Sequence, residues 1–433
     1  MATQLFLSPS GHVPHDPAGW CSDTDILIRN GVVVTQDAQR RIVEGNVWIE
    51  DGRIADIGKV NHTSDALVDA GGGIVMPGLI NTHTHVAMTE FRGMVDDIAL
   101  DEFLSKTFEL DAHRTESSIR ESTKTSLREM LLGGTTSFLD LYYGEDVIAE
   151  VCRDFRIRSF LSWVVLDEDK TTQKGRPIAN AERFVRNFSG GGLITPTVGL
   201  QGVYVCSKDT CDAARSLAMS RKTLLHMHLD ETRHEVYDHQ KRTGSRPVEW
   251  LNSFSFFSDC DVVGAHGAWL TRAEIGVLKK HGVSISHCAR SNMKLGSGIA
   301  PVVELKNEGV CVSVGTDSAT TSNNLDMFEE MRVASLLQKV NKWDAGIMNA
   351  QTVLDMTTRE AARSLRREDA IGSIEEGKRA DVIVLDSKSP RLHPLTRANA
   401  VNSIVYSAQG GDVVTTIVDG AIVVDDRKLL PVK

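Results

Sequence analysis

Alternation of apolar and polar residues marks the start of the chain as strand-forming. Residues 25–31 and 46–54 both alternate in this way, the first ending at Asn30-Gly31 and the second containing Asp51-Gly52. A period of two is typical of a half-buried strand, and an Asn-Gly or Asp-Gly pair after such a run is the strongest local signal of a β-hairpin. We therefore predict short strands with a turn at each of these pairs.

The end of the chain has the same rhythm. Residues 380–386 and 413–424 are rich in valine and isoleucine and indicate further strands. Two β-rich ends around a different middle predict one small β-sandwich domain built from both termini, comprising residues 25–72 and 374–433. Two separate β appendages are the alternative. Residues 1–24 precede the sandwich as an N-terminal tail.

The middle of the chain, residues 73–373, alternates between strand-like and helical patterns. The strand-like runs cover residues 73–82, 134–141, 159–166, 194–205, 223–229, 261–267, 282–287 and 311–317. Clear helical patterns cover residues 116–132, 213–220, 272–281 and 327–339. Eight strand-like runs separated mostly by helical patterns predict an α/β fold, a (β/α)8 TIM-type barrel whose catalytic groups collect at the carboxyl ends of its strands.

The composition limits the class of protein. A chain of 433 residues is long enough for one large and one smaller domain. Its net charge of −10 argues against a nucleic-acid partner, and no run of about 18 apolar residues is present that would span a membrane. The N-terminus lacks a basic start and an apolar core, so no secretion signal is expected. Seven scattered cysteines without a Cys-X-X-Cys pair favour reduced thiols in the cytoplasm.

Two histidines follow the first strand-like run of the middle region. His83 and His85 are one residue apart, shortly after Pro77-Gly78. Residues i and i+2 of a strand point to the same face, so both imidazoles can reach a single cation. Zinc accepts neutral imidazole, and a catalytic zinc site has about three protein ligands with one position open for water. Taken alone, such a pair is modest support for a metal site.

Further residues of the metal-binding type end three other strand-like runs. They are His226 and His228, then His266, then Asp317. Scattered core histidines would not fall repeatedly at strand ends, where a barrel places its active site. The pattern therefore predicts a metal centre assembled from distant parts of the chain.

The motifs around these residues resemble those of the amidohydrolase superfamily. They are Pro-Gly-Leu-Ile-Asn-Thr-His-Thr-His at 77–85, His-Met-His-Leu-Asp-Glu-Thr at 226–232, Gly-Ala-His-Gly at 264–267, Ser-Asn-Met-Lys-Leu-Gly-Ser-Gly-Ile-Ala-Pro-Val at 291–302 and Gly-Thr-Asp-Ser at 315–318. The resemblance covers residues 25–425 and is greatest to the branch of 5'-methylthioadenosine/S-adenosylhomocysteine deaminases and triazine chlorohydrolases. It supports the composite sandwich and implies a homo-oligomer, a dimer or tetramer.

The resemblance also implies the ligands of the metal. One divalent ion, zinc or alternatively iron, would be held by His83, His85, His228, His266 and Asp317. Relatives with two ions add a carboxylated lysine after a middle strand, and residues 159–166 and 194–205 contain no lysine. A bound cation lowers the pKa of its water to about 7, which gives hydroxide at neutral pH. The family role of Asp317 is to accept the proton of that water.

Two further residues are expected to act on the substrate. Glu231 lies three residues after His228, where a carboxylic acid can protonate a ring nitrogen and pass a proton to the leaving amine. His287 ends the seventh strand-like run, and its family counterpart hydrogen-bonds the attacking hydroxide. The alternatives are a solvated loop acid for Glu231 and a structural role for His287. The resemblance makes His226 a supporting or core residue instead of a ligand.

The expected substrate contacts depart from the family pattern. Asp111 stands where relatives acting on adenosine-type substrates have a glutamate that grips the ribose hydroxyls, and Gln201 stands in place of a histidine. Trp163 takes the place of an arginine at the end of the third strand, and Thr321 that of a serine after the metal-binding aspartate. Gln201 can hydrogen-bond a ring edge and Trp163 could stack on a flat heterocycle. Loss of the arginine argues against a substrate carboxylate, as in S-adenosylhomocysteine.

Together these features predict a metal-dependent hydrolytic deaminase acting on a small molecule. Its expected substrate is an aminated heterocycle of the adenosine-nucleoside type, such as a 5'-modified adenosine, converted to the inosine analogue and ammonia by metal-hydroxide attack. The first alternative is a hydrolase of a triazine, pterin or other non-nucleoside ring, acting by dechlorination or deamination. The second is a non-catalytic metal-binding barrel.

Overall fold

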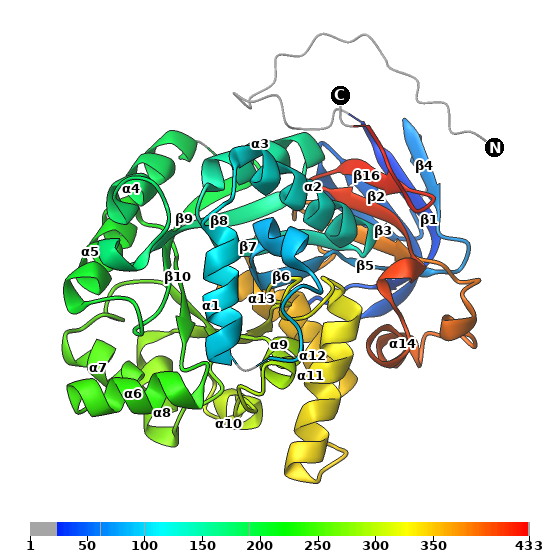
Figure 1. Ribbon diagram of the computed structural model, residues 1–433. Helices are drawn as coiled ribbons and strands as arrows, with labels where there is room; N and C mark the ends of the chain where they lie inside the picture. The colour runs from blue at the N-terminus through cyan, green and yellow to red at the C-terminus, as the bar shows by residue number, and fades with distance from the viewer. Residues whose placement is uncertain (1–23, 61, 99, 190, 432–433) are drawn as a thin grey trace.

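A ring of parallel strands encloses the centre of the molecule, and a mixed sheet lies beside it (Figure 1). The computed structural model describes residues 24–60, 62–98, 100–189 and 191–431. Of the predicted tail, residues 1–23 therefore lie outside the described part of the chain. The ring consists of β6 (Leu79–Thr84), β7 (Thr135–Tyr142), β8 (Arg158–Val165), β9 (Ile194–Leu200), β10 (Leu225–Leu229), β11 (Val262–His266), β12 (Ser284–His287) and β13 (Val312–Val314).

These strands pair in their order along the chain, and all of the pairings are parallel. Because β6 and β13 are the two ends of this sheet, the ring closes between them. Here the Thr82 hydroxyl donates to the carbonyl oxygen of Val314 at 3.0 Å, and the Asp317 N–H donates to the carbonyl oxygen of His83 at 2.9 Å. The eight-stranded barrel predicted from the sequence is confirmed.

Helices cover the outside of the barrel (Figure 1). They are α1 (Leu100–Asp111), α2 (Glu116–Leu132), α3 (Glu145–Phe155), α4 (Pro177–Phe188), α5 (Lys208–Arg221), α6 (Arg233–Thr243), α7 (Pro247–Ser253), α8 (Arg272–His281), α9 (Ala289–Lys294), α10 (Val302–Asn307), α11 (Met327–Lys342), α12 (Ala350–Thr357), α13 (Arg359–Ser364) and α14 (Ala400–Tyr406). The bounds of α2 and α8 agree with the prediction, whereas α5 and α11 are longer. No helix in the described ranges has the length and apolar character needed to cross a bilayer.

Capping residues explain why α8 begins and ends where it does. The Thr271 hydroxyl accepts a hydrogen bond from the N–H of Glu274, and the Glu274 carboxylate accepts one from the N–H of Thr271. Gly282 ends the helix with a left-handed backbone at φ 67°. A reciprocal capping box followed by a terminal glycine is a start and stop signal that can be read from sequence.

Both ends of the chain contribute to the mixed sheet. Its strands are β1 (Ile26–Val34), β2 (Ile42–Glu50), β3 (Arg53–Gly58), β4 (Ala66–Asp69), β5 (Ile74–Pro77), β14 (Val382–Leu385), β15 (Val413–Val418), β16 (Ala421–Asp425) and β17 (Lys428–Leu429). β5 joins the two groups, because it pairs with β1 on one side and β14 on the other. One hydrophobic cluster contains buried residues of both groups, among them Ile28, Val47, Val382 and Ile417. Both termini thus build one mixed sheet, as the predicted fold class requires, and the alternative of two separate appendages is wrong.

Of the two turns predicted near the start of the chain, one forms. Asp51 and Gly52 connect β2 to β3 with positive φ values of 51° and 71°, as a two-residue hairpin requires. At Asn30-Gly31 the prediction is wrong, because β1 continues through the pair with a shift of register. A Cβ on Gly31 would lie 2.5 Å from a methyl carbon of Val75, so glycine is needed for close approach of β5 instead of for a turn.

The predicted run at 73–82 consists of two strands. β5 belongs to the mixed sheet and β6 to the barrel, and only Gly78 separates them. A Cβ on Gly78 would lie 2.1 Å from the Thr136 hydroxyl oxygen, so only glycine fits where the chain passes from one sheet to the other. The strand that carries His83 is thus anchored directly in the mixed sheet.

Candidate metal centre and active site

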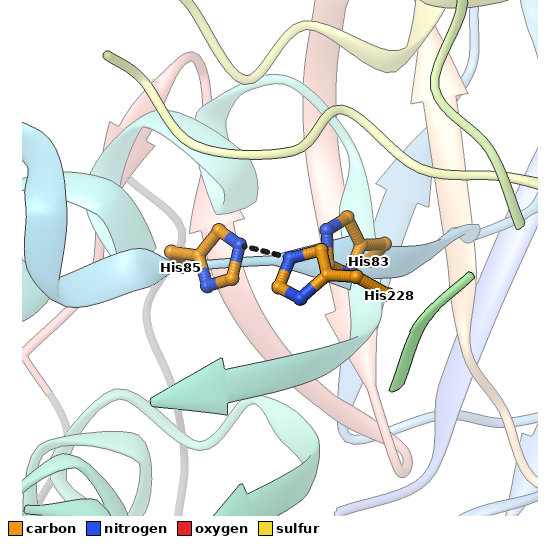
Figure 2. A group of neighbouring side chains, drawn as sticks. All are labelled: His83, His85 and His228. Atoms are coloured by element: carbon orange, nitrogen blue, oxygen red, sulfur yellow. Dashed lines mark hydrogen bonds between the residues drawn. The ribbon is translucent and has the colours of Figure 1, made fainter. Parts of the chain in front are cut away.

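Four histidines converge at the carboxyl ends of the barrel strands. His83 lies near the end of β6 and His85 just past it, while His228 lies on β10 and His266 ends β11. One ring nitrogen from each of His83, His85 and His228 lies within 4.8 Å of the others. Figure 2 shows these three rings turned toward one another, with the Nε2 atoms of His85 and His228 3.3 Å apart.

The Asp317 carboxylate faces the same point. One of its oxygens lies 3.3 Å from Nε2 of His85 and 3.7 Å from Nε2 of His83. The carboxylate is held by the Ser291 hydroxyl and the Ser318 N–H, each donating at 2.6 Å. Asp317 has a positive φ of 62°, a backbone conformation that aspartate tolerates better than most residues. The structure thus brings together all five residues predicted as ligands.

The Nδ1 atom of each of these histidines is bonded on the side away from the centre. Its partner is the carbonyl oxygen of Leu141 for His85 (2.5 Å), the carbonyl oxygen of Gln201 for His228 (2.8 Å), the side-chain oxygen of Asn292 for His266 (2.9 Å) and Nε2 of His226 for His83 (3.0 Å). Such outer partners fix the orientation and tautomer of metal-binding histidines. His226 accordingly supports His83, as expected.

The hydrogen bonds of His85 and His228 determine what their Nε2 atoms present. A carbonyl oxygen only accepts, so each neutral ring carries its proton on Nδ1 and a lone pair on Nε2. Two lone pairs 3.3 Å apart repel each other unless a cation lies against both. The Nε2 atoms of His83 and His266 are also buried without a hydrogen-bond partner in the described chain. The donor set therefore fits a divalent cation.

Electrostatics favour the metal-binding form of two of these rings, His83 and His228. Burial and the neighbouring imidazoles hold the pKa values of His83 and His228 well below their ordinary range. Both rings therefore stay neutral at physiological pH, and a neutral imidazole has the lone pair that a cation needs.

Glu231 lies beside the centre, and His287 ends β12, the strand next to the one that ends in His266. Glu231 follows the end of β10, and its carboxylate lies 3.9 Å from Nε2 of His266. Burial raises the pKa of Glu231, whose side chain is 14% exposed. His287 ends β12 fully buried, and neither ring nitrogen has a hydrogen-bond partner in the described chain. Burial also lowers the pKa of His287 to about 4, which keeps the ring neutral.

A cavity opens above these residues. It includes about 920 Å³ of empty space, part of which is open solvent at the mouth. Its floor includes His85, His228, His266, Glu231 and Asp317. Three of the predicted substrate contacts also line it, namely Asp111, Gln201 and Thr321.

Trp163 does not line this cavity, which corrects the predicted stacking role. Successive residues of β8 point to opposite faces, and Trp163 points outward while Val164 lines the cavity. The indole packs on Phe184 of α4, and its N–H donates to the side-chain oxygen of Gln173 at 2.9 Å. The tryptophan therefore belongs to the packing between strand and helix.

Asp111 is held by a group that the sequence analysis missed. The Tyr142 hydroxyl donates to the Asp111 carboxylate, and Arg114 donates to the Tyr142 oxygen at 2.9 Å. The Arg114 guanidinium is buried and also contacts Glu90 at 2.8 Å. Burial raises the pKa of Asp111, while the tyrosine and arginine oppose this shift. The position of Tyr142 at the carboxyl end of β7 was the available signal.

Comparisons with known proteins agree with this geometry. The amidohydrolase family pattern matches residues 74–423, and the chain belongs to this family. A solved adenosine deaminase from Xanthomonas campestris with bound zinc has a TM-score of 0.90 and 30% identity, covering 94% of this chain and 95% of its own. A solved atrazine chlorohydrolase from Arthrobacter aurescens TC1 complexed with zinc has a TM-score of 0.85 over 94% and 97% of the two chains; at 23% identity it shows the shared fold.

Two relatives are similar over nearly the whole sequence. A 5'-deoxyadenosine deaminase from Methanobrevibacter smithii is 38% identical over 413 residues, 94% of each chain. A 5-methylthioadenosine/S-adenosylhomocysteine deaminase from Thermococcus onnurineus is 37% identical over 408 residues, 93% of this chain and 95% of its own. The superfamily inferred from the motifs is confirmed, and so is the similarity to the deaminases of the predicted branch.

Proposed function

We propose that this protein is a metal-dependent hydrolase that removes the amino group from adenosine-type nucleosides. The products are the corresponding inosine analogue and ammonia. The observation that carries this proposal is the pair of Nε2 lone pairs on His85 and His228, which face each other beside Asp317 and Glu231 at the floor of a cavity. The names of the similar deaminases support the substrate class.

The metal ligands in this proposal are His83, His85, His228, His266 and Asp317. Zinc is the favoured ion, because imidazole nitrogens suit it and a similar adenosine deaminase was solved with zinc bound. Iron is the alternative. When bound, such a cation lowers the pKa of a coordinated water to about 7.

The side chains around the centre then move protons. The Asp317 carboxylate accepts the proton of the attacking water. The Ser291 hydroxyl and the Ser318 N–H hold this carboxylate in place. Glu231, whose raised pKa favours the protonated form, gives a proton to the ring nitrogen beside the amino-bearing carbon. Glu231, now a carboxylate, takes up the remaining proton of the attacking oxygen and relays it to the amine as it leaves, and the proton held by Asp317 then restores the acid. A neutral His287, with two unpartnered nitrogens, can hydrogen-bond the attacking oxygen.

The cavity wall holds the remainder of the nucleoside in this proposal. Asp111, fixed by Tyr142, accepts hydrogen bonds from the ribose hydroxyls. The Gln201 side chain and the Thr321 hydroxyl offer further polar contacts. Because Trp163 is packed outside, no aromatic stacking from this residue contributes to base binding.

A substrate panel tests the proposal. The zinc-loaded protein would be assayed by ultraviolet absorbance and by ammonia release on adenosine, 5'-deoxyadenosine, 5'-methylthioadenosine, S-adenosylhomocysteine, guanine, a pterin and melamine. We expect ammonia and an inosine-type spectral change from the first three. Ammonia from only a bare heterocycle would refute the nucleoside assignment, and no release from any compound would refute the deaminase assignment.

A further inference from the structure

A thiol lies beside the histidine cluster. Cys288 directly follows the strand β12 that ends in His287 and is fully buried. Its sulfur and one ring nitrogen from each of His83 and His266 lie within 4.8 Å of one another. The thiol donates to the carbonyl oxygen of Ser286 at 3.6 Å. The sulfur is close to two candidate metal ligands and keeps lone pairs with which it can bind a cation.

The two histidines near this thiol have nitrogens to offer. Nδ1 of His83 is bonded to His226, and Nδ1 of His266 to Asn292. Their Nε2 atoms are fully buried without a hydrogen-bond partner in the described chain. Two imidazole nitrogens and a thiol at this spacing form a donor set of the kind that soft divalent cations select.

We propose that His83, His266 and Cys288 form a second cation position that thiophilic metals such as cadmium occupy in preference to the predicted five-residue set. This inference rests on the proposed function for its account of the main metal position. Because both positions use His83 and His266, their occupation is mutually exclusive. An ion held by the Cys288 sulfur therefore withholds two ligands from the catalytic arrangement.

The thiol must lose its proton for this binding. Without a cation the buried sulfur is a thiol that donates to the carbonyl oxygen of Ser286. On binding, the sulfur gives an electron pair to the cation and its proton leaves to the buffer, so no oxidant or reductant is needed. The resulting thiolate is a strong ligand for soft metals and a poor one for hard metals.

Cadmium titration of the metal-free protein tests this position. We expect a thiolate-to-cadmium charge-transfer band in the ultraviolet, saturating at one ion per chain. In Cys288→Ser the band should vanish. Cadmium affinity should fall by at least about tenfold, because even removal of a residue that only supports a metal ligand typically costs about 10- to 100-fold. Circular dichroism and a melting curve would show that the variant is folded.

Cys311→Ser is the matched control. Cys311 immediately precedes β13 at the opposite end of the barrel, and its sulfur contacts Glu360 and Arg363. This variant should keep both the band and the affinity. An equal band in Cys288→Ser would overturn the inference while leaving the proposed function intact. Failure of the unmodified protein to bind any divalent cation would overturn the metal centre, and the proposed function with it.

Discussion

The floor and the wall of the cavity are built on opposite principles. On the floor, the histidine Nδ1 atoms are bonded outward, and the Nε2 atoms of His85 and His228 point lone pairs at each other. On the wall, the polar groups already satisfy one another, as where Tyr142 donates to Asp111. The lone pairs on the floor need a cation to pair with, whereas the polar groups on the wall are already hydrogen-bonded without a ligand. The structure therefore indicates the metal-dependent chemistry more clearly than it indicates the substrate.

Removing the metal should have the largest effect, because it leaves the floor without its central charge. Treatment with a chelator should lower kcat on a nucleoside by about three orders of magnitude or more, since a bound cation supplies several kcal/mol of transition-state stabilisation. Zinc should restore turnover. Calcium should not, because it prefers oxygen ligands. Retained activity after metal content has fallen to background would contradict the account of the floor.

Glu231→Gln removes a proton donor from the floor without removing a ligand. We expect kcat to fall by about 10²- to 10⁴-fold, the usual contribution of general acid–base catalysis. Metal content, measured by elemental analysis, should stay at the level of the unmodified protein. Glu109→Gln, at an exposed position of α1, is the control and should leave kcat unchanged. A near-normal rate in the Glu231 variant would remove this residue from the mechanism.

Tyr142→Phe loosens the wall and leaves the floor unchanged. Loss of a hydrogen bond to a charged group costs about 1.5–3 kcal/mol, so kcat/KM on nucleosides should fall by about 10- to 100-fold, mainly through KM. Trp163→Phe is the matched aromatic change outside the cavity and should leave KM unchanged. If both variants raise KM equally, the effect reflects general packing, and the proposed binding of the ribose hydroxyls by Asp111 is contradicted.

Thr321→Val should have the smallest effect of the four. Its hydroxyl already donates to the carbonyl oxygen of Ser318 at 3.1 Å, so it has little capacity left for a substrate. We expect kcat/KM to change by about two- to tenfold, equivalent to one neutral hydrogen bond. A loss as large as that of the Tyr142 variant would mean that the Thr321 hydroxyl contributes as much to substrate binding as the contact between Tyr142 and Asp111.

Residues that follow a periodic rule could be predicted from the sequence. The barrel strands are apolar runs, and metal-binding residues recur at their carboxyl ends, so the predicted ligands did meet at one point. The caps of α8 were likewise readable, since Thr271 and Gly282 act within one turn of the helix.

What depends on register or on distant neighbours could not be predicted in this way. Trp163 is predicted to face the cavity because it stands where relatives have an arginine, but this comparison does not say which face of the strand the residue occupies. Asn30-Gly31 looks like a turn locally, yet the close approach of Val75 makes it part of a continuous strand. The hold of Tyr142 on Asp111 joins residues 31 positions apart and follows no local pattern.

The closure of the barrel also joins the floor to the fold. Between β6 and β13 the ring is held by hydrogen bonds of Asn81, Thr82, His83 and Asp317, among others, and His83 and Asp317 are predicted ligands. If His83 and Asp317 share an ion, that ion also stabilises the closure of the barrel. Losing the ion would then destabilise the junction of β6 and β13 more than the rest of the barrel, and amide hydrogens along β6 and β13 would exchange with solvent sooner than those of β8 and β9. A single ion would thus have both a catalytic and a structural role.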